Sequence, residues 1–166
     1  EAYASHAANL LRTWFLDPAT RMNPNLRYAQ AIPGYLSGRA AGIIDALCLP
    51  YVAEAAIMLR DSNAWTSRDH QALVHWFREF LHWLTTSPQG RSESRADNNH
   101  ATCFDLQVVS YALFVGDRSL ALETLRRVGP KRIAPQIEPD GRQPEELART
   151  RSYSYSVKNR RSPSQI

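Results

Sequence analysis

The sequence predicts an all-α fold made of antiparallel helical hairpins. Apolar residues recur at the three- and four-residue spacing of amphipathic helices in five or six segments of the chain. The ten prolines and seven glycines fall mostly between these segments, where they mark helix ends and loops. No alternating pattern typical of strands rivals the helical one, and short to medium connections favour antiparallel neighbours.

The first two predicted helices cover residues 2–16 and 38–60. The first carries an apolar stripe and ends at Asp17-Pro18, because the residue before a proline avoids the helical conformation. A loop rich in Asn and Pro follows over residues 21–34. The second helix is almost continuously apolar, which predicts a central position, and Pro50 should bend or interrupt it.

Three more helices are predicted at residues 67–86, 100–115 and 118–128, and a sixth begins at Pro144. The first of these three has a wide aromatic face. We expect Ser87-Pro88-Gln89-Gly90 to end it, a polar stretch to follow over 88–99, and Gly129-Pro130 to end the helix at 118–128. Residues 1–157 are expected to form one domain, and residues 158–166 a disordered basic tail.

Charge and composition narrow the function classes. The chain has 166 residues, is 43% hydrophobic and carries a net charge of +4, which suits a single globular domain. The segment from Arg142 to the end holds six basic and two acidic residues, so it accounts for the whole excess. A nucleic-acid binder usually spreads basic residues over a folded face, so no nucleic-acid partner is expected, whereas a polyanionic sugar would suit a local basic patch.

Cysteine content and hydropathy add two further expectations. Cys48 and Cys103 both lie in apolar helical surroundings, which predicts two buried free thiols and no disulfide framework. We expect no apolar run to approach the length that spans a membrane, and the chain opens in a helical pattern that does not resemble a secretory signal. We therefore expect no membrane association.

Four residues far apart in the sequence suit one reaction. Asn99, His100, Arg149 and Tyr155 supply an amide, an imidazole, a guanidinium and a phenol. The amide and the guanidinium can hold a carboxylate and stabilise enolate-like charge, while the imidazole and the phenol can move protons. These groups together fit β-elimination on a uronic-acid sugar. Asn98 is expected mainly to cap the following helix, because Asn is a favoured N-cap residue.

Several blocks of this sequence resemble the alginate lyase superfamily, especially its glucuronan- and alginate-cleaving members. The resemblance runs from about Tyr3 to Asn159, and these blocks carry it: Gly38-Arg39, Gly42-Ile43-Ile44-Asp45, Asn98-Asn99-His100 with Asp105 and Gln107, Gln136-Ile137, and Pro139-Asp140-Gly141-Arg142-Gln143-Pro144. It implies an (α/α) toroid with a substrate groove across one end. It also implies a secreted or periplasmic enzyme that cleaves an acidic polysaccharide without a cofactor or a metal.

The resemblance also implies roles for individual residues. Asn99 resembles the carboxylate-neutralising amide, His100 the catalytic histidine, Arg149 the charge-stabilising arginine and Tyr155 the proton-transferring tyrosine. Substrate contacts are expected from the first loop, from a turn tryptophan that could stack on a sugar, and from neighbours of the four: Arg21, Asn23, Gln30, Trp65, Asn98, Arg151 and Tyr153.

The sequence of residues 149–155 is compatible with either an extended or a helical backbone. If the segment is extended, Arg149, Arg151, Tyr153 and Tyr155 all project to one side. If it is helical, Arg149 pairs with Tyr153 and Arg151 with Tyr155. A solvated basic face is the competing interpretation, and the elimination could be syn or anti.

The sequence also departs from the family pattern. Ala101, Cys103 and Phe104 stand where relatives tend to carry a glycine and an aromatic pair. The chain is shorter than a complete toroid, so we expect an incomplete, apparently truncated ring whose exposed end helices promote self-association. The alternative function is a non-catalytic helical carbohydrate-binding or scaffold module derived from a lyase.

Overall fold

The computed structural model describes the backbone of residues 1–164 and the side chains of residues 1–159. The α-helices, numbered in chain order, are α1 (Ala2–Leu11), α2 (Leu49–Met58), α3 (Ser67–Thr86), α4 (Pro88–Glu93), α5 (Asn99–Val115), α6 (Arg118–Val128), α7 (Ala134–Gln136), α8 (Pro144–Leu147) and α9 (Ser152–Ser164). Within the described range there is no strand, only one isolated bridge between Ile32 and Leu36. The all-α prediction is confirmed.

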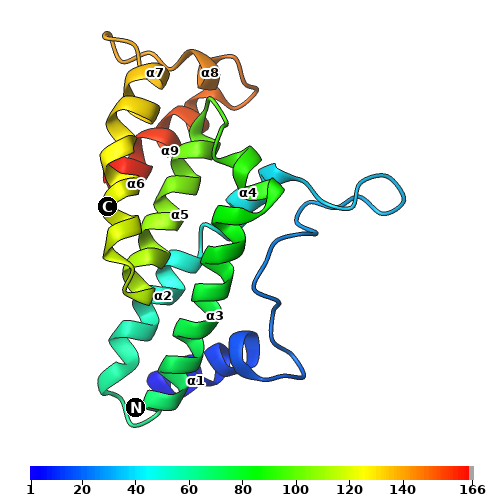
Figure 1. Cartoon of the computed structure of the whole chain (residues 1–166), viewed down its shortest axis with the longest axis vertical. Coiled ribbons are helices and arrows are strands. Elements are labelled where there is room, and N and C mark those ends of the chain that lie inside the picture. Colours follow the sequence, from blue (N-terminus) through cyan, green and yellow to red (C-terminus); the bar gives the residue numbers. More distant parts are fainter. Residues whose placement is uncertain (165–166) are drawn as a thin grey trace.

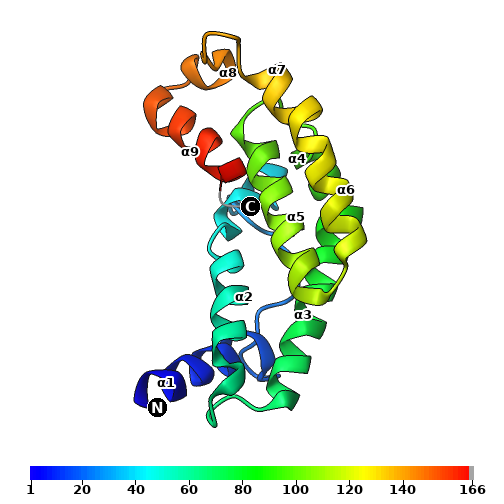
Figure 2. The same cartoon turned by 90° about the vertical axis from the view of Figure 1, so that its left-hand side faces the viewer.

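The long helices run alternately up and down the molecule. Figure 1 shows α3, α5 and α6 side by side, with α5 antiparallel to both of its neighbours. Figure 2 shows α2 next to this group, and α9 crossing near the start of α5 at the upper end. The largest sets of contacts between elements join α5 to α6, α3 and α9, so α5 is the central helix. The predicted antiparallel hairpins are therefore present.

The core lies between α3 and its neighbours and is rich in aromatic rings. Trp76 contacts Phe15 edge-on at 4.8 Å and stacks on Phe80 at 5.3 Å, measured between ring centroids. Phe77 and Phe80 reach Tyr111 of α5 at 5.2 and 5.5 Å. All five rings are buried, as the helical spacing on α3 predicts.

The corner between α3 and α4 requires a glycine and places α4 near the start of α5. A β-carbon on Gly90 would lie within 1.7 Å of the Leu84 carbonyl oxygen, so no larger residue fits there without movement of the backbone. The Ser87 hydroxyl accepts a hydrogen bond from the Gly90 N–H and caps α4. This corner corrects the expectation of a polar stretch over 88–99, because its first residues form α4.

The apolar segment 38–60 is not one helix. A 3-10 segment, Ala40–Ala46, precedes α2, and Pro50 lies in the first turn of α2, where its missing N–H costs nothing. Residues 40–61 together are long and apolar enough to cross a membrane by length and composition, with a mean hydropathy of 1.7. This corrects the expectation that no run approaches that length. About 44% of that window is buried inside the protein.

Three further expectations differ from the structure. Gly129-Pro130 does not end the helix, because a π-helical turn, Gly129–Ile133, joins α6 to α7. Cys103 is buried as expected, but Cys48 is exposed. Helix α9 includes residues 158–164 of the segment expected to be a disordered tail, while residues 165–166 lie outside the described range.

Candidate active site

The first turn of α5 carries the Asn-Asn-His sequence. Asn98 is the N-cap, and its side-chain oxygen accepts a hydrogen bond from the His100 N–H at 3.1 Å, as its predicted capping role requires. The next residue, Asn99, is completely buried. The local sequence therefore fixes the start of the helix, and the helix places Asn99 inside the protein with His100 next to it.

Asn99 is held by two residues, Glu146 of α8 and Arg149 of the segment between α8 and α9. The Glu146 carboxylate accepts a hydrogen bond from the Asn99 backbone N–H. Arg149 donates from Nη1 to the Asn99 side-chain oxygen at 2.6 Å and to Glu146 at 2.9 Å. Because both bonds use Nη1, they leave the rest of the guanidinium unused.

These contacts decide the orientation of the Asn99 amide. Its oxygen must face Arg149, since a guanidinium can only donate. Its nitrogen, Nδ2, is therefore directed elsewhere, and among the described residues it has no hydrogen-bond partner although it is buried. Buried donors without a partner are rare in native proteins, and those that occur are often functional. Asn99 thus presents an unused N–H donor.

Tyr155 lies against the same arginine. The Arg149 guanidinium carbon is 3.5 Å from the centroid of the Tyr155 ring, a close cation–π contact. Helix α9 carries Tyr155 and is anchored by buried amides: Asn159 donates to Gln136 at 3.2 Å and to Gln143 at 2.9 Å. Three of the four predicted catalytic residues, Asn99, Arg149 and Tyr155, therefore form one contact chain.

The fourth residue, His100, pairs with a carboxylate from α4. His100 Nδ1 lies 2.6 Å from a Glu93 carboxylate oxygen, and the side chains of His100 and Glu93 are only 16% and 5% exposed. An ionised carboxylate can only accept, so Nδ1 carries the proton in this pair. In a neutral imidazole, the other nitrogen, Nε2, is then left as a proton acceptor.

Neither sequence hypothesis for residues 149–155 describes the segment, which is neither extended nor one helix. Helix α9 begins only at Ser152, and Arg149 contacts Tyr155 rather than Tyr153. Tyr153 is 81% exposed, and Arg151 is also exposed. The hypothesis of a solvated basic face fits Arg151, which is exposed. It does not fit Arg149, which donates hydrogen bonds to the buried side chains of Asn99 and Glu146.

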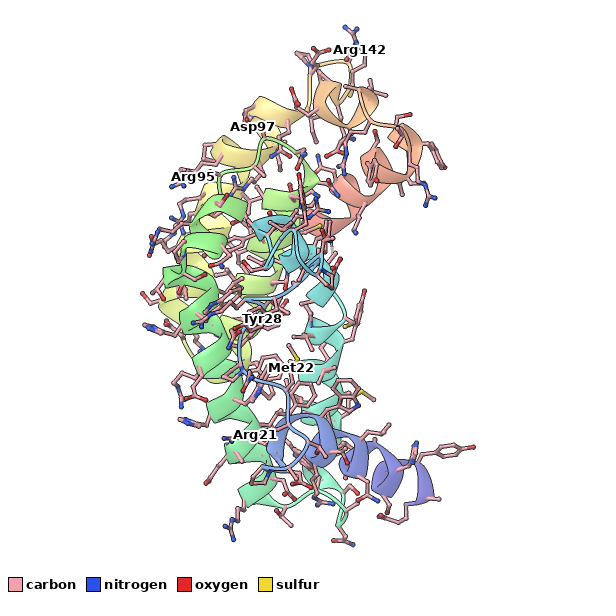
Figure 3. The ribbon with its side chains drawn as sticks, turned by 90° about the vertical axis from the view of Figure 1, so that its right-hand side faces the viewer. Arg21, Met22, Tyr28, Arg95, Asp97 and Arg142 are labelled. Atoms are coloured by element: carbon pink, nitrogen blue, oxygen red, sulfur yellow. The ribbon has the colours of Figure 1, made fainter. Side chains whose placement is uncertain are left out.

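Among the described residues, no hydrogen bond joins the predicted substrate contacts of the first loop to the four residues. Gln30 is already engaged, since it donates to Asp45 at 3.0 Å and accepts from Arg39 at 2.7 Å. Arg21 and Asn23 are exposed. Figure 3 shows Arg21 well below Asp97, which directly precedes the Asn98 cap, along the long axis. The structure does not bring Arg21 to the four residues.

Trp65 is not available for sugar stacking in this structure. It is only 3% exposed, its indole nitrogen lies 3.4 Å from His70 Nδ1, and the Arg12 guanidinium covers its ring at 5.7 Å. Its turn, between α2 and α3, is at the lower end of the molecule in Figure 1, opposite the start of α5. The expectation of an exposed platform was wrong, because the turn folds back onto the first turns of α3.

Sequence analysis missed the two carboxylates that hold this site. Glu146 has a weak signal, its i,i+3 spacing to Arg149. Glu93 has none, because its partner His100 lies on another helix, and the turn between α4 and α5 brings the two together. Among the described residues, no group of three or more His, Cys, Asp or Glu side chains is placed to hold a metal ion.

Comparison with known proteins identifies the family. The family model described as alginate lyase matches residues 1–159. The fold is similar to the crystal structure of an alginate lyase from Bacteroides ovatus, with a TM-score of 0.92 and 38% sequence identity. The similarity covers 99% of this chain but only 45% of that one, so this chain spans less than half of the relative's length. No curated protein matches the chain. With its family match, its (α/α) toroid architecture and the Asn-His, Arg and Tyr of its site, this chain belongs to the alginate lyase family.

Proposed function

We propose that this chain carries the catalytic site of a polysaccharide lyase that cleaves a polyuronate, glucuronan or alginate, by β-elimination. The observation that carries the proposal is the unused Asn99 amide N–H beside Arg149, which is stacked on Tyr155. Amide and guanidinium donors are suited to a carboxylate, and a phenol next to them can transfer a proton.

The first task of the site is to neutralise the substrate carboxylate. The C5 proton of a uronate is weakly acidic while that carboxylate keeps its full charge. Asn99 Nδ2 and the unused nitrogens of Arg149 would donate to the carboxylate oxygens and stabilise the charge that develops on them. Asn99 is completely buried, so a covering side chain must move before a sugar can reach it.

The second task is proton transfer. Either Tyr155, as the phenolate, or His100 Nε2 takes the C5 proton, the electron pair forms the C4–C5 double bond, and the C4–O4 bond breaks. Tyr155 then donates a proton to O4 of the leaving sugar: the proton that it took from C5 on the first route, or its own phenol proton on the second. If Tyr155 performs both transfers the elimination is syn, and if His100 is the base it is anti. Glu93 supports the second route, because it leaves Nε2 as the acceptor.

The partner that we propose is therefore an acidic polysaccharide, with neither nucleic acid nor a membrane. We also expect a secreted or periplasmic protein, as the family resemblance implies. The mechanism draws on no cofactor and on no metal, since amide and guanidinium donors neutralise the carboxylate. The alternative is a carbohydrate-binding or scaffold module without turnover, which the complete burial of Asn99 would favour.

Ultraviolet absorbance of the unsaturated uronate tests the proposal. We expect the signal to rise when the protein meets glucuronan or alginate, and the faster substrate identifies the uronan. Tyr155→Phe keeps the ring under Arg149 and removes only the hydroxyl, so activity should fall by about 10²–10⁴-fold. Tyr153→Phe, at an exposed position, is the matched control and should retain activity. Affinity for the polymer without absorbance would instead show a binding module.

A further inference from the structure

A second concave site lies on the side of α5 opposite α9. It is a pocket of about 280 Å³ between the end of α3, the turn after α4, α5 and the end of α6. In Figure 3 Arg95, which lines it, lies on the α6 side of the molecule, away from α9. None of the four proposed catalytic residues lines this pocket.

Four cationic side chains line the pocket: Arg95, Arg127, Lys131 and Arg132. Asp105 is the one carboxylate in the lining, and Arg132 neutralises it through two hydrogen bonds of 2.7 and 3.2 Å. Arg127 has only a loose contact of 3.6 Å with Glu123, which lies outside the lining. The pocket therefore keeps an excess positive charge that no acidic side chain in its wall balances.

A buried hydroxyl adds a second observation. Thr124 also lines the pocket and is 1% exposed, yet its hydroxyl has no hydrogen-bond partner among the described residues. Buried hydroxyls normally have a partner, either protein or water. An oxygen atom held in the pocket would supply the missing acceptor after a small shift of the wall.

We propose that this pocket is a second binding site for a carboxylate-bearing sugar, separate from the candidate active site. The proposal rests on the proposed function for its choice of ligand, since a polyuronate presents a carboxylate on every residue. The volume is just below the roughly 300–1,000 Å³ of typical ligand pockets, which fits one sugar rather than several. Phe104 supplies an apolar wall beside the cations, as an amphipathic sugar ring requires. The site would hold the polymer while another segment of it is cleaved.

Binding of methyl glucuronide tests the inference without turnover, because this probe has no glycosidic bond at O4 to eliminate. Side-chain NMR signals of Arg95, Arg127 and Arg132 should shift as the probe is added. The double variant Arg95→Gln/Lys131→Gln should weaken this binding by about tenfold or more, as expected for the loss of charge-assisted hydrogen bonds. Arg126→Gln removes an exposed charge of α6 outside the lining and should change the affinity less than twofold.

Sodium sulfate is the second probe, and it separates a sugar site from a general anion site. If sulfate shifts the pocket signals and methyl glucuronide does not, the sugar proposal is overturned. Unchanged arginine signals, or equal binding by the double variant, would overturn it as well. If methyl glucuronide shifts the pocket arginine signals but the chain has no lyase activity, the second site is supported and the proposed function fails. If the chain has lyase activity but these signals do not shift, the proposed function is supported and the second site is overturned.

Discussion

Replacement of Glu93 by Gln tests how the protonation of His100, the proposed catalytic histidine, is controlled. The Glu93 carboxylate lies 2.6 Å from His100 Nδ1, and both side chains are largely buried. Gln has the same shape but no charge, and its amide can either accept from Nδ1–H or donate to a bare Nδ1. The variant therefore keeps the packing and removes the preference for one tautomer.

The magnitude follows from the strength of a hydrogen bond to a charged group, about 1.5–3 kcal/mol. Since 1.36 kcal/mol corresponds to a tenfold change in rate, losing this bond from the transition state predicts a fall in kcat of about 10- to 150-fold. KM should change little, because Asn99 and Arg149 keep their contacts with the substrate carboxylate. A lower kcat with an unchanged KM is the expected signature of an interaction that strengthens as the proton moves.

Two measurements check this prediction. Steady-state absorbance kinetics give kcat and KM, and ¹⁵N NMR of the imidazole reports which ring nitrogen carries the proton. We expect Nδ1–H in the wild type and a mixture in Glu93→Gln. Glu79→Gln, at an exposed carboxylate that also contacts a histidine, is the matched control. A wild-type imidazole protonated only on Nε2, or a variant with full kcat and an altered tautomer, would refute the reasoning.

Three further predictions concern the arginine of the site, the pH dependence of stability and the apolar groove. Arg149→Lys should lower kcat/KM by about 10²-fold in the absorbance assay, since an ammonium cannot bond to Asn99 and Glu146 and also stack flat on Tyr155; equal activity would contradict this. The second prediction concerns Asp69, whose carboxylate accepts a hydrogen bond of 2.6 Å from Arg12; this bond lowers the pKa of Asp69 from 3.8 to about 2. The pair therefore stabilises the fold above pH 4, and this contribution is lost as the pH falls towards 2. Asp69→Asn should therefore cost about 1–2 kcal/mol in urea unfolding at pH 7 and almost nothing below pH 2, and a difference that persists in acid would count against the assignment. Trp14 is 59% exposed and lines an apolar groove of about 570 Å³ between α1 and α2. We therefore expect the chain to self-associate in sedimentation experiments and Trp14→Gln to weaken the self-association. A monomeric wild-type protein would exclude this prediction.

Some features of the site could be predicted from neighbouring residues in the sequence, and others could not. Asn98 could be predicted as a helix cap because capping depends on the cap and the next three residues alone. The pairing of Arg149 with Tyr155 could not, because they are six positions apart and the chain changes conformation between α8 and α9. The helical alternative predicted Tyr153 as the partner of Arg149, and the extended alternative predicted no particular partner.

The first loop shows a similar limit. Gln30 was expected to contact substrate, but it is bound to Asp45 and Arg39, whose positions depend on how the loop returns to the 3-10 segment at 40–46. Trp65 was expected to be exposed because turns usually are, yet its large apolar ring is buried against Arg12 and His70. Polar type and turn position alone do not decide whether a side chain is free to bind.

Apolar period, capping and turn residues act over a few positions, so the long helices α3, α5 and α6, the buried aromatic face of α3, the cap of α5 and the family could be predicted from the sequence. The contacts of Glu93 and Glu146, and the gathering of four basic residues around one pocket, became visible only in the folded chain. Glu146 reaches Asn99 across 47 positions, and the basic residues of the pocket come from the turn after α4, from α6 and from the turn after α6. The charge of a short segment does not show which others will face it. The turn between α4 and α5 places Glu93 beside His100, and the amides that anchor α9 hold the helix that carries Tyr155.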